Sequence, residues 1–161
     1  MKRLWVGILV MMFVIIIPVL LSFADDNYAT ADECVAMVDK VVERIKSEGF
    51  DAVKVDINAT GGPYGWKDSY IFCFDTKEGI VLAHPYMPSG PSTPSLLNMT
   101  DMKGKAFIKE MLDTANKDGK GWVEYYAQRK GVADLLLKKA YVVKVPDEEI
   151  VVGAGYFPIE K

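Results

Sequence analysis

Histidine and cysteine are scarce in this chain of 161 residues, which has one histidine and two cysteines. The cysteines do not form a Cys-x-x-Cys pair, and the single histidine, His84, leaves no His-x-x-x-His spacing. Because a dedicated zinc site needs several such ligands, the sequence predicts no metal centre and no cofactor. His84 also lacks a serine or acidic partner at a diagnostic spacing, so we expect no enzyme activity. The alternative is an enzyme or cofactor carrier that uses His84 as general base or axial ligand.

Positive charge is limited as well. The chain has 19 Lys and Arg against 22 Asp and Glu, a formal net charge of −3, and its basic residues are not clustered. Proteins that bind nucleic acid present a basic surface to the phosphates, so we exclude nucleic acid as a partner. The length suffices for one core-forming domain and is too short for two ordinary ones.

The chain has one long apolar run, and it lies at the N-terminus. The run covers residues 4–21, after the basic residues Lys2 and Arg3, and the small residue Ala24 follows it. This pattern predicts a signal peptide over residues 1–24 and a mature domain over residues 25–161. The alternative is an uncleaved N-terminal anchor, because about 18 apolar residues are just enough to span a bilayer. In both interpretations the domain is exported to the periplasm or the extracellular space. In the second, the uncleaved N-terminal segment tethers it to the membrane.

The two cysteines, Cys34 and Cys73, would share an oxidising compartment in an exported domain. A disulfide between them would close a loop of about 40 residues and stabilise the fold by roughly 4 kcal/mol. We favour the alternative, in which both are buried, unpaired thiols that pack as small apolar side chains.

Two helices are predicted. The segment 30–49 begins with Thr30 as a cap, has acidic residues in its first turn and ends at Gly49. The segment 101–116 places apolar residues along one side of a helix. Residues 50–58 are ambiguous, because AVKVDI alternates like a strand.

β-rich runs predict five strands, over residues 67–74, 80–84, 121–127, 136–145 and 150–156. The prolines in residues 85–94 make that segment a loop. We therefore expect an α+β domain with a five-stranded antiparallel sheet. The first helix should cover one face, and the Pro-rich loop and second helix should form a lid over the other, above a small-ligand pocket.

The candidate ligand-binding residues are Tyr70, His84, Trp122, Tyr125, Lys138 and Tyr141. Tyr70 shares a strand face with two phenylalanines, so it belongs either to the sheet core or to the pocket floor. Pro85 holds His84 extended, which would present the imidazole at the pocket rim. The alternative for His84 is a structural histidine that is hydrogen-bonded to loop backbone.

Trp122 and Tyr125 lie on opposite faces of one strand, because side chains alternate. Core filling is the favoured alternative for Trp122, whereas Tyr125 fits core and pocket equally. Lys138 is either an anion partner in a half-buried pocket or a solvated surface charge. Because Lys138 and Tyr141 are an odd distance apart, they point to opposite faces unless a bulge intervenes.

Four segments resemble a known family: YIFCFDTKEGIVLAHP (70–85), KGKAFIKEM (103–111), GKGWVEYY (119–126) and KKAYVVKVPDEEIVVGAGYF (138–157). In this order and spacing they resemble the single Cache domain of the second type, which supplies extracytoplasmic small-molecule sensing modules, often on chemoreceptors and sensor kinases. The resemblance covers roughly residues 31–157. It implies a PAS-like fold with a helical or irregular connector at residues 50–58, and ligand contacts from the His84–Pro85 pair, the GWVEY strand, Lys138 and Tyr141.

The resemblance also implies the function that we expect. This is an exported sensory domain that binds a small organic acid or amino acid without transforming it, and signals to a separate membrane receptor or kinase. Two loops, at residues 93–95 and 127–137, lack the sequence motifs that are usual in the family, and both border the expected pocket. The alternative is a structural or protein-interaction module of the cell envelope that binds no small ligand.

Overall fold

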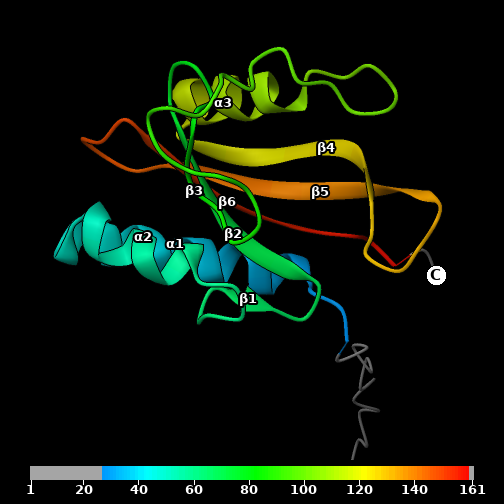
Figure 1. Cartoon of the computed structure of the whole chain (residues 1–161), viewed down its shortest axis with the longest axis horizontal. Coiled ribbons are helices and arrows are strands. Elements are labelled where there is room, and N and C mark those ends of the chain that lie inside the picture. Colours follow the sequence, from blue (N-terminus) through cyan, green and yellow to red (C-terminus); the bar gives the residue numbers. More distant parts are fainter. Residues whose placement is uncertain (1–26, 160–161) are drawn as a thin grey trace, which may run out of the picture.

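The computed structural model describes residues 27–159 (Figure 1). The predicted signal peptide, residues 1–24, lies outside the described residues. Among the residues that are described, no helix is both long and apolar enough to cross a membrane.

Helix α1 (Ala31–Glu48) forms where the sequence predicts it. The Thr30 hydroxyl accepts a hydrogen bond from the Glu33 amide, and the Glu33 carboxylate accepts one from the Thr30 amide, so a capping box closes the first turn. The buried stripe of the helix consists of Cys34, Val38, Val41, Val42 and Ile45. Gly49 ends the helix with a φ of 84°, a backbone conformation that favours glycine.

Residues Phe50–Asn58 form helix α2, so the alternating pattern in this segment does not produce a strand. Val53 and Ile57, which are four residues apart, are buried, whereas Val55 between them is 66% exposed. This spacing matches one face of a helix and places both buried side chains in the core that contains α1. The family resemblance implies a helical or irregular connector here, and the structure shows the helical form.

The five predicted strands are present as β2 (Ser69–Asp75), β3 (Val81–Ala83), β4 (Lys120–Gln128), β5 (Leu135–Lys144) and β6 (Ile150–Tyr156). The sheet also has a sixth, short strand that was not predicted, β1 (Gly65–Trp66), which pairs with the start of β2. The pairs are antiparallel, and the strand order is β1-β2-β6-β5-β4, with β3 also paired to β2. The last strand in the sequence therefore lies in the middle of the sheet, beside β2.

Helix α3 (Phe107–Asp118) begins later than the predicted start at Asp101. The Asp101 carboxylate instead accepts hydrogen bonds from the amides of Lys103, Lys105 and Tyr126. These bonds hold residues 101–105 in a turn, because an aspartate that binds nearby backbone competes with helix formation.

The two faces of the sheet carry separate hydrophobic cores. Helix α1 packs on one face against β2, β5 and β6, and α3 packs on the other against β4 and β5 (Figure 1). Gly153 allows a close approach within the second core, because a Cβ at this position would overlap the Phe72 ring. The predicted α+β arrangement, with a helix on each face of an antiparallel sheet, is confirmed.

Cys34 and Cys73 are buried, and within residues 27–159 both are free thiols. The Cys34 sulfur lies 3.9 Å from the Ser69 hydroxyl oxygen. Burial raises the pKa of the Cys34 thiol to about 11, so it stays protonated at neutral pH. The favoured expectation of two unpaired, buried cysteines is confirmed.

Candidate ligand-binding site

Two adjoining hollows open on the side of the sheet that α3 covers. The smaller, with a volume of about 210 Å³, lies between β2, α3 and the loop after β3. The larger, of about 580 Å³, lies beside the β1–β2 turn and the β4–β5 loop. Tyr70, Gln128 and Lys138 line both hollows, so Lys138 stands where they meet.

Lys138, on β5, is only 7% exposed. Its ammonium lies 5.0 Å from the centre of the Tyr70 ring and 5.1 Å from that of Phe157. Among residues 27–159, no hydrogen bond or ion pair to this ammonium is found. Gly155 leaves room for the side chain, since a Cβ there would lie 2.9 Å from Lys138 Cε. The site thus contains a buried cation that lacks a counter-ion from the described residues.

Burial sets the electrostatics of Lys138. It lowers the pKa of the ammonium from 10.5 to about 8, while the Asp68 carboxylate acts in the opposite direction. The group is therefore mostly charged at neutral pH. An anion in either hollow would supply the missing partner.

His84 follows β3 and is 8% exposed. Its Nδ1 accepts hydrogen bonds from the amides of Tyr86 at 3.0 Å and Met87 at 3.1 Å. Because Nδ1 is the acceptor, the neutral ring carries its proton on Nε2. Burial, and then the nearby charge of Lys138, lower the pKa of His84 to about 4. His84 thus has the structural role that we considered, and its Nε2–H group remains as a donor.

Tyr70 and Tyr125 complete the polar part of the smaller hollow. The Tyr70 ring meets His84 edge-on, with 4.9 Å between ring centres. Tyr125 stacks on Phe107 of α3, with a centre distance of 4.3 Å and an interplanar angle of 9°. Burial raises the pKa of both tyrosines, so each hydroxyl keeps its proton and can donate a hydrogen bond.

Trp122 and Tyr141 lie on the other face of the sheet. Their ring centres are 5.2 Å apart, and Tyr141 belongs to the core that contains α1. The register of β5 is continuous against both neighbours, so Lys138 and Tyr141 point to opposite faces, as alternation predicts. The structure therefore brings Tyr70, His84, Tyr125 and Lys138 together, and places Trp122 and Tyr141 away from them.

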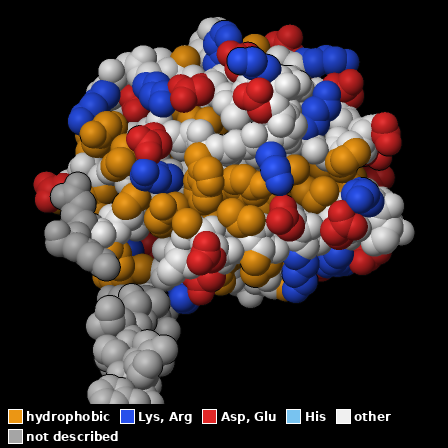
Figure 2. Space-filling model, turned by 180° about the vertical axis from the view of Figure 1, so that it is seen from behind, with side chains coloured by type: hydrophobic (Ala, Val, Ile, Leu, Met, Phe, Trp, Pro, Cys, Tyr) orange, Lys and Arg blue, Asp and Glu red, His pale blue; other side chains and the backbone are white. Residues whose placement is uncertain are grey.

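Trp122 is 40% exposed. Figure 2 shows the molecule from behind, where apolar side chains form a band between the layer of α3 above and the layer of α1 and α2 below. Trp122 lines neither hollow, so it adds apolar surface that is exposed outside them.

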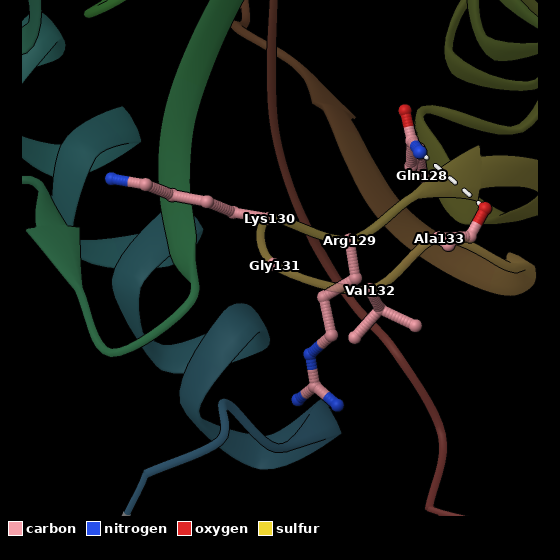
Figure 3. Close-up of a pocket in the computed structure, with 6 residues that line it drawn as sticks. All are labelled: Gln128, Arg129, Lys130, Gly131, Val132 and Ala133. Atoms are coloured by element: carbon pink, nitrogen blue, oxygen red, sulfur yellow. Dashed lines mark hydrogen bonds between the residues drawn. The ribbon is translucent and has the colours of Figure 1, made fainter.

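An ion pair at the rim of the larger hollow was not foreseen. The Arg129 guanidinium donates to Asp68 Oδ2 at 2.6 and 2.9 Å and lies 3.5 Å from the centre of the Tyr28 ring. Asp68 Oδ1 accepts a hydrogen bond from the amide of Ala29, just before α1. Figure 3 shows Arg129 extending away from the hydrogen bond between Gln128 and Ala133. No sequence signal could find this pair, because its members are 61 residues apart.

Comparison with known proteins gives the family. Among curated proteins, none matches this chain. One similar solved structure is a periplasmic sensor domain of a chemotaxis protein, at 22% identity and a TM-score of 0.59, covering 78% of this chain and 88% of that one. Another is a methyl-accepting chemotaxis protein from Vibrio parahaemolyticus RIMD 2210633, at 22% identity and a TM-score of 0.62, covering 78% and 86%.

A third similar structure is that of a Cache chemosensory domain, solved to show the structural basis for its carboxylic acid recognition. It has 18% identity and a TM-score of 0.63, and the match covers 80% of this chain and 92% of that one. At these identities the likeness concerns the fold, and the predicted PAS-like arrangement of helices and antiparallel sheet agrees with it. The family model for the single Cache domain 2 matches residues 22–158. The chain belongs to the single Cache domain 2 family.

Proposed function

We propose that this chain is an extracytoplasmic sensory domain that binds the anion of a small organic acid and passes the signal to a separate membrane receptor or kinase. The observation that carries this proposal is the buried ammonium of Lys138, which has no hydrogen-bond or ion-pair partner among residues 27–159 and lies at the meeting point of two hollows. The family and the basic, apolar N-terminal sequence support a place outside the cytoplasm.

A carboxylate fits the donors at this point. Lys138 supplies a charge, His84 an Nε2–H group and Tyr70 a hydroxyl, and all three line the smaller hollow. Hydrogen bonds from a cation to a carboxylate are about twice as strong as those between neutral groups. Binding would also relieve the cost of burying the ammonium without a partner.

An organic acid fits this site better than an amino acid does. None of the described residues that line the smaller hollow is Asp or Glu. An amino acid bound there would bury its ammonium beside Lys138 without a counter-ion, which is unfavourable. Asp68 lines the larger hollow, but Arg129 and the Ala29 amide already bind its two oxygens.

Binding without chemical change is supported by the state of His84. Its Nδ1 lone pair is taken by two backbone amides, and Nε2 carries the proton. Neither nitrogen can then accept a proton from a substrate, so the histidine is unsuited to general base catalysis. This argument works against the alternative of an enzyme built on His84.

The test compares propionate with alanine, which differ by one amino group. Native mass spectrometry would detect a ligand that copurifies, and thermal unfolding would report stabilisation by each compound at millimolar concentration. We expect propionate to raise the Tm and alanine to have little effect. Lys138→Met should abolish the shift, whereas Lys139→Met, which removes a cation paired with Glu124, should keep it. A protein that no organic acid stabilises would contradict the proposal and favour the interaction module.

A further inference from the structure

The smaller hollow has a polar end and an apolar end. The polar end is formed by Tyr70, His84, Tyr125, Gln128 and Lys138. The Tyr70 ring contacts His84 and the Lys138 ammonium, and Tyr70, Gln128 and Lys138 also line the larger hollow. A carboxylate held at Lys138 therefore sits at the boundary between the two hollows, and the rest of the ligand can extend into the smaller one.

The apolar end consists of hydrocarbon, aromatic rings and thioethers. Its walls include Phe72 and Phe74 from β2, Ile108 and Met111 from α3, and Met87 and Leu96 from the loop. Methionine side chains adapt to irregular apolar shapes, so this end can close around a flexible chain. Lys138 is the single charged residue among the described residues of the lining, so a second charge on the ligand would be buried without a partner.

The volume of the hollow limits the length of the ligand. A cavity of about 150 Å³ holds one benzene molecule, which has six carbon atoms. By the same packing, a hollow of 210 Å³ holds roughly eight non-hydrogen atoms. A carboxylate accounts for three of these, which leaves room for an apolar tail of about five carbons.

We propose that the preferred ligand of this site is a monocarboxylate whose apolar tail of about five carbons fills the hollow between β2 and α3. This inference rests on the proposed function, since it assumes that a carboxylate binds at Lys138. Each CH₂ group moved from water into the hollow strengthens binding roughly fourfold. Hexanoate, with four more CH₂ groups than acetate, should therefore bind at least about tenfold more tightly, after allowance for incomplete burial.

The test is a calorimetric titration of the purified protein with sodium acetate, butyrate, hexanoate and octanoate, each measured separately. Adipate is the matched control for hexanoate, because it has the same number of carbons and a second carboxylate at the far end. We expect affinity to increase from acetate to hexanoate and to gain little further with octanoate. Adipate should bind at least about tenfold more weakly than hexanoate, because its second charge would be buried.

Narrowing the hollow tests where the tail lies. Ala127 on β4 lines the hollow and is half-buried, so Ala127→Leu would add bulk to the wall with little strain on the core. The ratio of hexanoate to acetate affinity should fall in this variant. If the variant does not fold, the chain-length series on the unaltered protein still decides.

The outcomes separate the two proposals. Acetate binding as tightly as hexanoate, or adipate binding as tightly as hexanoate, would overturn the inference about the tail and leave carboxylate binding intact. An unchanged ratio in folded Ala127→Leu would likewise overturn the placement of the tail. Failure of every acid to bind, acetate included, would overturn the proposed function and this inference with it.

Discussion

Replacing Lys138 with methionine should make the unliganded protein more stable at neutral pH. The ammonium is buried and, among the described residues, has no hydrogen-bond or ion-pair partner. Its pKa falls from 10.5 to about 8 on folding, a difference that corresponds to about 3 kcal/mol lost from the free energy of unfolding while the group stays charged. Methionine has a similar length and no charge, so Lys138→Met should recover much of that free energy.

The stability gained by Lys138→Met should decrease as the pH rises. Between about pH 8 and pH 10.5 the unfolded chain holds a proton on Lys138 that the folded protein has released, so the stability of the unaltered protein rises with pH over this window. Below about pH 8 the destabilisation is fully present. The difference between Lys138→Met and the unaltered protein should thus be largest near neutral pH and shrink toward pH 10.5.

Urea unfolding, followed by tryptophan fluorescence near pH 7 and again between about pH 9 and 10, measures this difference. Lys139→Met is the matched control, because the Lys139 side chain is 33% exposed and pairs with Glu124. Loss of such a surface pair should change the free energy of unfolding by less than about 1 kcal/mol. A variant Lys138→Met that is no more stable than the unaltered protein at pH 7, or a gain that does not vary with pH, would refute the reasoning.

The shifted pKa values and the packing of the sheet lead to four further predictions. Carboxylate affinity should fall above about pH 8, by up to tenfold for each pH unit, as Lys138 loses its proton; calorimetry at neutral and alkaline pH measures this, and a constant affinity would contradict it. The NMR signals of His84, the single histidine, should show a neutral Nε2–H ring down to about pH 5, because its pKa is about 4. For the same reason, stability should fall as pH drops from 6.5 toward 4, where the unfolded chain binds a proton that folded His84 does not. Gly153→Ala should cost about 1–3 kcal/mol, because its Cβ would overlap the Phe72 ring. Gly65→Ala, whose Cβ has its nearest contact at 4.0 Å, is the control and should stay within about 0.5 kcal/mol in urea unfolding.

Elements that depend on neighbouring residues could be predicted from the sequence. The capping box at Thr30 and the buried stripe of α1 involve contacts three or four residues apart, and the strands follow runs of β-rich residues. The prediction missed the start of α3, because the Asp101 carboxylate binds the nearby amides of Lys103 and Lys105 and also the amide of Tyr126, which lies 25 residues away. The alternation at residues 50–58 was misleading for a similar reason: burial of Val53 and Ile57 depends on packing within the core that contains α1.

In the candidate site, too, the sequence predicted local features and the tertiary structure decided which residues come together. Alternation predicted that Lys138 and Tyr141 point to opposite faces of the sheet, and the continuous register of β5 confirms that no bulge changes this. The tertiary structure decided which face carries the hollow, since that depends on where α3 and the loop after β3 pack. It thereby grouped Lys138 with His84 and left Tyr141 in the core that contains α1. The tertiary structure also decided that the Lys138 ammonium is buried without a hydrogen-bond or ion-pair partner from the described part of the chain, because burial is a sum over contacts from strands and loops far apart in the sequence.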